Sequence, residues 1–226
     1  MSVGSRLVLR FSVGLLLVAV LLFVPAGTLY YWQGWAYLAL FFVPGVTLSL
    51  WLYRRDPQLI ERRLQSKEKV KEQKMLVRLL KPVFVAVFLL AGLDYRMGWT
   101  RREFGRVPLW LTILAQALFL AGILLVFWVM KVNSYASRTV QVEAGQKVIS
   151  DGPYRTVRHP MYSGSILMWI ATPVALGSYF ALPAFAVLIP FYVIRLLNEE
   201  EVLRRELPGY PEYCERTRFR LAPRVW

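Results

Sequence analysis

Cysteine and histidine are almost absent from this sequence, and no dinucleotide-binding glycine pattern is present. The 226 residues include one cysteine, Cys214, and one histidine, His159. A single cysteine excludes an internal disulfide and any multi-cysteine cluster, and with only one histidine a zinc or di-metal centre is not expected. No Gly-x-Gly-x-x-Gly run is found, so the sequence gives no sign of a Rossmann domain. We therefore predict no metal site.

Charged residues are also scarce. They make up 19% of the chain, against about a quarter in typical soluble domains, while 57% of the residues are hydrophobic. No Ser, Gly or Pro stretch is long enough to link two domains, and no internal repeat is found. This composition predicts a single membrane domain over 1–226. We divide it into a part with N-terminal spans and a basic loop, 1–147, and a part with the chemistry-bearing motifs, 148–226.

The formal net charge of +14 indicates an anionic partner. Lys and Arg lie between the apolar runs and not along one amphipathic helix face, so membrane headgroups are favoured and nucleic acid is not.

Six apolar runs of helical length predict an all-α integral membrane protein. Each can cross most or all of the roughly 30 Å hydrocarbon layer, and the last two, separated by Gly177 and Ser178, predict a C-terminal helical hairpin. The predicted spans are 7–24, 30–53, 75–93, 107–130, 161–176 and 179–197.

The segment 54–81 indicates the orientation. It holds ten Lys or Arg against four acids, which is typical of a cytoplasmic loop. Six spans then place the N-terminus, the segment 131–159 and the C-terminal tail on that same face. The basic loop around Arg101 would lie on the other face and does not fit this rule.

The first chemistry-bearing segment is 148–164, which reads VISDGPYRTVRHPMYSG. Pro160 favours the first turn of a helix, so Arg158 and His159 would lie at the mouth of the fifth span. A helix N-terminus beside an arginine suits an anionic or carboxylate-bearing ligand. The alternative, which the spacing leaves open, is that these residues only hold the helix start at the headgroups.

The second segment is 195–226, which begins RLLNEEEVLRRELPGYPEYCERTRF. Arg195 and Glu199 are four residues apart on a predicted helix and can pair, either as part of a site or as an ordinary interfacial ion pair. Tyr210 and Tyr213, next to Pro208 and Pro211, would offer two rings just outside the bilayer. A purine or ribose could rest there, or the rings could pack on the membrane surface.

Together these two segments resemble the isoprenylcysteine carboxyl methyltransferase family and its relatives, the membrane phospholipid methyltransferases. The resemblance covers roughly the C-terminal third, and its residues are Gly152, Tyr154, Arg158, His159, Pro160, Tyr162 and Gly164, then Arg195, Glu199, Glu200, Leu203, Tyr210 and Tyr213.

The resemblance implies a methyltransferase that uses S-adenosylmethionine and encloses it between the hairpin and the cytoplasmic tail. It implies catalytic roles for Arg195 and Glu199. It implies a cofactor site made of Tyr154, Arg158, His159, Tyr162, Glu200, Tyr210 and Tyr213.

The expected acceptor is the carboxylate of a prenylated cysteine or a similar lipophilic molecule. A carboxylate is ionised at neutral pH and needs no general base, whereas a phospholipid amine or a small thiol would have to lose a proton. Glu199, Glu200 and His159 are the candidate bases for those alternatives. A lipid-borne acceptor would enter between the spans, while the cofactor would enter from water.

Two other classes are weighed. Sterol-type reductases resemble this family in their C-terminal half but bind a nicotinamide cofactor, and we expect them to be longer. A transporter would carry ionisable residues at mid-membrane in several helices, whereas here the early spans hold almost none, and those present, such as Arg10, Lys81 and Asp94, are near the span ends.

Overall fold

The computed structural model describes residues 3–65, 71–136, 142 and 145–226. Within these residues helices are the only regular secondary structure, as the apolar runs predict. They are α1 (Val3–Ala26), α2 (Trp32–Arg55), α3 (Pro57–Gln65), α4 (Lys71–Met97), α5 (Trp99–Glu103), α6 (Leu109–Val132), the 3₁₀ turn η1 (Gly152–Arg155), α7 (Pro160–Ala175), α8 (Leu182–Ala186), α9 (Leu188–Glu206) and α10 (Tyr210–Arg216).

Four helical stretches of the described chain are long and apolar enough to cross a membrane. They are Gly4–Ala26, Trp32–Arg55, Leu109–Val132 and Leu182–Glu206. The other two predicted spans also form helices, within α4 and α7. However, α7 has 16 residues, about 24 Å of helix, which is short of the roughly 30 Å hydrocarbon layer. The chain is therefore an integral membrane protein, and the count of six spans remains a prediction.

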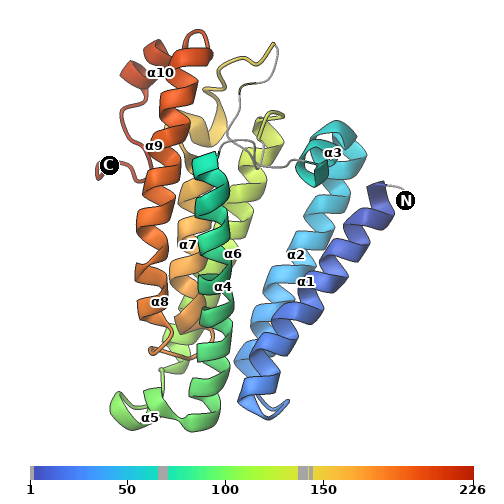
Figure 1. Ribbon diagram of the computed structural model, residues 1–226, viewed down its shortest axis with the longest axis vertical. Helices are drawn as coiled ribbons and strands as arrows, with labels where there is room; N and C mark the ends of the chain where they lie inside the picture. Colours follow the sequence, from blue (N-terminus) through green and yellow to red (C-terminus); the bar gives the residue numbers. More distant parts are fainter. Residues whose placement is uncertain (1–2, 66–70, 137–141, 143–144) are drawn as a thin grey trace.

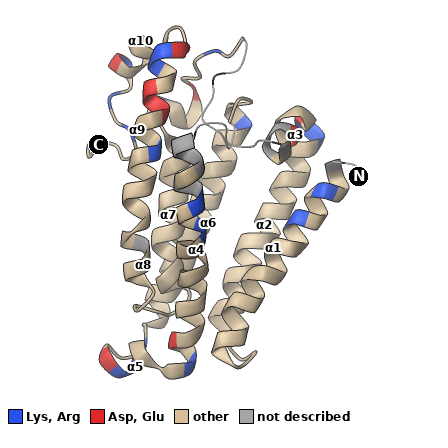
Figure 2. Cartoon of the chain, in the orientation of Figure 1, with Lys and Arg blue, Asp and Glu red and all other residues tan. Residues whose placement is uncertain are grey.

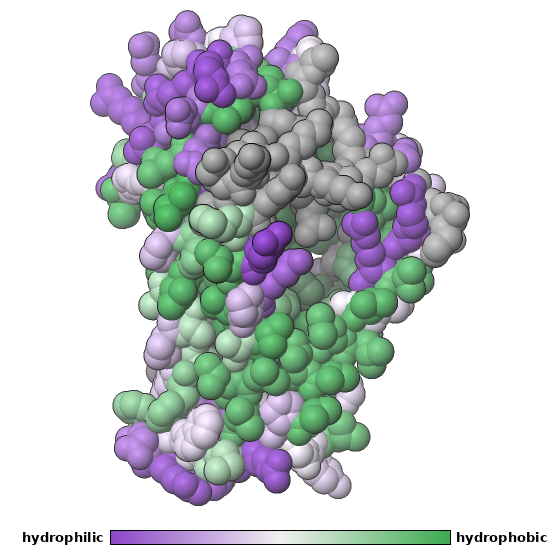
Figure 3. All heavy atoms as spheres, in the orientation of Figure 1, coloured by the Kyte–Doolittle hydropathy of each residue, from purple (hydrophilic) through white to green (hydrophobic). Residues whose placement is uncertain are grey.

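The long helices run alternately up and down, so the segments between them fall at two ends (Figure 1). The N-terminus, α3, the start of α7, the end of α9 and α10 share one end, and α5 lies at the other. Lys, Arg, Asp and Glu gather at these ends (Figure 2), and green apolar side chains cover much of the surface between them (Figure 3). Both chemistry-bearing segments lie at the same end of the helices, as their predicted emergence on one side requires.

Five long helices share one core. Leu22 of α1, Tyr37 of α2, Phe88 of α4, Phe119 of α6 and Ala171 of α7 are all buried in one cluster. The Tyr37 ring lies 4.6 Å from that of Phe119 and 5.7 Å from that of Phe88, between centroids. This core fixes the helices that carry the site relative to one another.

The most extensive helix–helix interface in the described chain joins α6 and α7. Two glycines permit it: a Cβ on Gly164 would lie 2.9 Å from the Gly122 carbonyl oxygen, and a Cβ on Gly122 would lie 2.7 Å from the Gly164 carbonyl oxygen. Small residues allow such close backbone approach between membrane helices. The predicted turn at Gly177 follows α7, with φ at +74°, but the principal neighbour of α7 is α6 and not α9.

Asp94, one of the ionisable residues noted near the ends of the early spans, has a structural role. Its carboxylate is buried and accepts a hydrogen bond from the Thr100 backbone N–H at 2.7 Å and another from the Thr100 hydroxyl. The Thr100 hydroxyl oxygen in turn accepts from the Tyr179 backbone N–H at 2.9 Å. This chain of contacts joins α4 and α5 to the segment after α7, at the end opposite the chemistry-bearing segments.

Candidate functional site

The start of α7 is held by the C-terminal tail. Pro160 occupies the first turn of α7, where its missing N–H costs nothing, and His159 is the residue before it. The backbone N–H groups of Arg158 and His159 donate to the carbonyls of Phe219 and Arg220 at 2.9 and 3.0 Å. The tail therefore lies directly against the segment that sequence analysis placed at the helix mouth.

A buried carboxylate joins this segment to α9. Glu200 is 4% exposed, and its Oε1 lies 2.9 Å from Arg158 Nη1 and 3.2 Å from His159 Nε2. Its Oε2 accepts a hydrogen bond from Arg220 Nε at 3.1 Å. Burying a carboxylate is costly unless it is paired and hydrogen-bonded, and Glu200 satisfies both conditions. We call Arg158, His159, Glu200 and Arg220 the Glu200 cluster.

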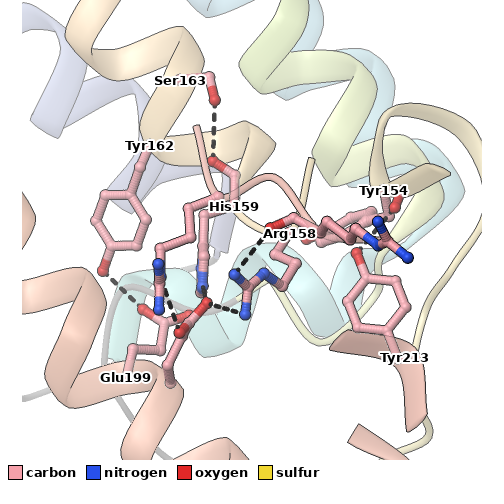
Figure 4. Close-up of polar contacts among 10 residues, drawn as sticks. Tyr154, Arg158, His159, Tyr162, Ser163, Glu199 and Tyr213 are labelled. Carbon is pink, nitrogen blue, oxygen red and sulfur yellow. Dashed lines mark hydrogen bonds and ion pairs between the residues drawn. The ribbon is translucent and has the colours of Figure 1, made fainter. Parts of the chain in front are cut away.

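Glu199, the neighbour of Glu200, points toward a different partner (Figure 4). Its Oε2 accepts a hydrogen bond from the Tyr162 hydroxyl at 2.6 Å. Arg195 is one helical turn earlier on α9. The pairing predicted between Arg195 and Glu199 stays a prediction, whereas the contact with Tyr162 links α9 to the first turn of α7.

Tyr154 and Tyr213 connect η1 to α10. The Tyr213 hydroxyl donates to the Tyr154 carbonyl at 2.8 Å, and the Asn133 amide at the end of α6 donates to the Tyr154 hydroxyl at 2.7 Å. Burial raises the pKa of Tyr154 to about 12, and burial also raises that of Tyr213. Both phenols are therefore neutral at physiological pH.

Gly209 turns the chain from α9 into α10. Its φ of +82° lies in the region that glycine adopts at low cost and other residues rarely do. The turn brings Tyr210 and Tyr213 back against Leu207 and Val148, where both tyrosines are buried. The two tyrosines therefore pack inside the protein and not on the membrane surface.

A cavity of about 490 Å³ lies between these elements. Near η1 and α10 its wall carries polar groups, on Asn133, Tyr154, Arg158, His159, Tyr210 and Tyr213, together with the apolar side chains of Val148, Leu203 and Leu207. The other end lies between the long helices and is apolar, with Phe41, Leu80, Val126, Met168, Trp169 and Tyr192. Arg195, Glu199 and Tyr162 also line the cavity, so charged side chains and apolar ones surround a single space.

Eight of the nine predicted site residues line this cavity, as part of the wall that the structure describes. Glu200 is the exception, because its carboxylate is occupied by the Glu200 cluster. Arg220, Asn133 and the apolar wall were not predicted from the sequence. Arg220 lies in a tail with several arginines, and nothing in the sequence distinguishes it from its neighbours.

Two buried polar atoms beside the cavity have no hydrogen-bond partner among the described residues. They are the Tyr210 hydroxyl and Arg158 Nε. Buried polar groups are normally satisfied, so unpaired ones on a cavity wall indicate a polar ligand. In the described chain no group of three or more His, Cys, Asp or Glu side chains could hold a metal ion.

The fold and the cavity are those of an integral membrane protein with a buried site at one end of its helices. Residues 110–208, less than half of the chain, match the family model of phospholipid methyltransferases. This match begins in α6, so it extends further toward the N-terminus than the two motifs do. It stops before Tyr210 and Tyr213.

Two curated proteins illustrate the similarity. Delta(14)-sterol reductase TM7SF2 of Mus musculus is 31% identical over 94 residues, which are 39% of this chain and 22% of that protein. Protein-S-isoprenylcysteine O-methyltransferase B of Arabidopsis thaliana is 33% identical over 79 residues, which are 34% of this chain and 40% of that protein. Each match therefore spans less than half the length of the relative.

The resemblance to isoprenylcysteine and phospholipid methyltransferases is confirmed by the family match and by the Arabidopsis relative. Together they support a membrane methyltransferase. The similarity to a sterol reductase is also the one that sequence analysis weighed as an alternative.

Proposed function

We propose that this chain is an S-adenosylmethionine-dependent membrane methyltransferase that methylates a lipophilic acceptor, such as the carboxylate of a prenylated cysteine. One observation carries the proposal: a single cavity has the polar groups of η1 and α10 on one part of its wall and apolar side chains of the long helices on another, with Arg195 and Glu199 also on its wall. Such a space suits a polar methyl donor and a lipophilic acceptor, which have to be in contact for transfer.

The residues at the polar end fit the cofactor. S-adenosylmethionine carries a carboxylate, an ammonium, a ribose and a purine, and beside the cavity the Tyr210 hydroxyl and Arg158 Nε have no hydrogen-bond partner among the described residues. Tyr154, His159, Tyr162 and Tyr213 complete this wall. The Glu200 carboxylate contacts both Arg158 and His159 but does not line the cavity. We therefore assign Glu200 a positioning role in place of direct cofactor contact.

When bound, S-adenosylmethionine supplies a methyl group that an acceptor takes by in-line displacement, the sulfur–methyl bond breaking with its electron pair left on sulfur. Arg195 orients the acceptor carboxylate, which is already ionised because its pKa is about 3.5. Glu199, fixed by the Tyr162 hydroxyl, shapes the wall beside Arg195. The main task of these residues is alignment and exclusion of water. A phospholipid amine or a small thiol acceptor would instead need Glu199 as a base.

The cavity end of the molecule belongs on the cytoplasmic side in this proposal. The N-terminus, α3 and the start of α4, whose residues belong to the basic N-terminal part and to the segment 54–81, share that end with the site. Cytoplasmic loops carry such an excess of Lys and Arg. The cofactor would then enter from the cytoplasm and the acceptor from the lipid.

Calorimetric titration of detergent-purified protein tests the proposal against the reductase alternative that the mouse relative suggests. We expect S-adenosylhomocysteine to bind and NADPH not to bind. A transfer assay with radiolabelled S-adenosylmethionine against total membrane lipid, a prenylated cysteine and small thiols then identifies the acceptor class. Binding of NADPH without S-adenosylhomocysteine would replace the methyltransferase proposal by a reductase.

The substitution His159→Ala is expected to weaken S-adenosylhomocysteine binding about 10-fold. The change removes a cavity-wall ring and a contact to buried Glu200, and a hydrogen bond to a charged group is worth about 1.5–3 kcal/mol. Calorimetry on membrane-inserted protein measures the effect. His159→Gln keeps a hydrogen-bond donor and should retain affinity within about threefold. Wild-type affinity in His159→Ala would show that this residue does not help to hold the cofactor.

A further inference from the structure

Helices outside the family match contribute to the apolar wall of the cavity. Phe41 is on α2 and Leu80 is on α4, and both line the cavity. The matched region, 110–208, supplies the rest of the apolar wall through α6, α7 and α9. The apolar wall of this cavity is thus completed by two residues that lie before the matched region, Phe41 and Leu80.

Phe41 is firmly held in this position. Its ring lies 4.9 Å from that of Phe42 and 5.9 Å from that of Phe119, between centroids, and it stacks at 6.4 Å on Tyr37. The Tyr37 hydroxyl shares a 3.2 Å hydrogen bond with Thr172 of α7. Because its neighbours belong to the shared core, Phe41 cannot move aside without disturbing α6 and α7.

Leu80 is supported from the opposite side. It packs, partly buried, against the cluster of Val87 and Leu188, which also contacts Trp169 and Tyr192. Trp169 in turn meets Phe84 edge to face, with centroids 5.3 Å apart. The apolar end is therefore walled by packed side chains of defined size.

The space at this end is limited. Pockets for one drug-sized ligand occupy about 300–1,000 Å³, and the whole cavity has about 490 Å³. A cofactor of that size at the polar end would fill much of the cavity, so little volume would remain for the acceptor beside the apolar wall. Small changes of that wall then matter, since one methylene in a tight apolar pocket changes kcat/KM about 10- to 200-fold.

We infer that Phe41 and Leu80 determine acceptor specificity, by limiting the size of the apolar group that can lie next to the reacting atom. This inference rests on the proposed methyltransferase function. The acceptor class that fits is one whose apolar group is slender near the reacting atom, with any bulk further out between the helices. Specificity is then set by α2 and α4, while the region with the two motifs supplies the transfer chemistry.

Alanine substitutions in lipid nanodiscs test this inference. The probes are N-acetylcysteine carrying S-butyl, S-decyl or S-farnesyl groups. In Phe41→Ala and Leu80→Ala we expect the ratio of kcat/KM for the farnesyl over the butyl probe to rise about 10-fold or more. S-adenosylhomocysteine affinity should stay within about threefold, because neither residue lies at the polar end. Phe41→Leu replaces Phe41→Ala if the latter is not inserted.

The chain offers matched controls. Leu79 is 46% exposed and Val43 is 61% exposed, and neither lines the cavity that the structure describes. Leu79→Ala and Val43→Ala should therefore leave the probe ratio unchanged. An unchanged ratio in Phe41→Ala, Phe41→Leu and Leu80→Ala would overturn the inference even if methyl transfer is normal.

A binding measurement separates this inference from the proposed function. A ligand that binds only the folded protein raises its thermal midpoint, so midpoint shifts report which probes bind even without transfer. If no probe is methylated but the variants still shift the binding preference from butyl toward farnesyl, the methyltransferase proposal fails and the specificity role stands. If transfer occurs with the same probe preference in every variant, the methyltransferase proposal stands and the specificity role of Phe41 and Leu80 fails.

Discussion

Glu200→Gln is expected to abolish S-adenosylhomocysteine binding and to lower the thermal midpoint of the protein. The carboxylate accepts from Arg158, His159 and Arg220, and an amide would turn an N–H₂ group toward one of these donors. Arg158 is only 7% exposed, and breaking a buried ion pair by removing one partner costs about 3–5 kcal/mol. Calorimetry and thermal unfolding in nanodiscs measure the two effects.

Glu206→Gln is the control for this change, because it breaks an ion pair on the same helix that is exposed. Glu206 lies 3.0 Å from Arg205, and their side chains are 44% and 67% exposed. Exposed pairs are worth about 0–1 kcal/mol, so neither binding nor stability should change measurably. If Glu200→Gln behaves like Glu206→Gln, the Glu200 cluster does not organise the site.

The helices could be predicted because each apolar run is long enough to require one. The packing of those helices could not. Whether α7 packs mainly on α6 or on α9 depends on two glycines, Gly122 and Gly164, that lie in different spans. Gly164 belongs to the first motif, but Gly122 has no feature that marks it as its partner.

The meeting of the two chemistry-bearing segments could be predicted from topology alone, since an even number of crossings separates the basic segment 54–81 from each of them. The division of roles among three consecutive acids could not be predicted. Neighbouring helix positions point about 100° apart, so the packing of α9 decides which acid meets which partner. In the structure Glu199 meets Tyr162, Glu200 meets the cations, and Glu201 is exposed.

The tail illustrates a second limit of sequence reasoning. Arg220 completes the Glu200 cluster and its backbone carbonyl accepts from His159 N–H. Ser163 contacts the tail as well, donating to the Leu221 carbonyl at 2.6 Å. The contacts from His159 and Ser163 are made to backbone carbonyls, which every residue carries, so no residue pattern predicts them.

Glu199→Gln is expected to lower kcat about 100-fold while S-adenosylhomocysteine affinity changes less than threefold. Glu199 lies on the cavity wall but outside the Glu200 cluster, so its loss should leave Arg158 and His159 in place. It should, however, loosen the contact with Tyr162 and the wall beside Arg195. A misplacement of about 1 Å in the reacting geometry costs about 100-fold in rate. Single-turnover transfer and calorimetry measure the two quantities separately.

Two further variants accompany this prediction: Tyr162→Phe removes the partner of Glu199, and Glu201→Gln is the control. Removing the hydroxyl that holds Glu199 should lower kcat about 10-fold, and changing the exposed neighbour Glu201 should have no effect.

The pH profile of the Glu199→Gln variant separates two roles of Glu199, alignment and general base. With a carboxylate acceptor no base is needed, so the residual rate of Glu199→Gln should follow the wild-type profile. With an amine acceptor and Glu199 as base, the residual rate would instead rise with pH as the free amine forms. Wild-type turnover in Glu199→Gln would contradict both roles.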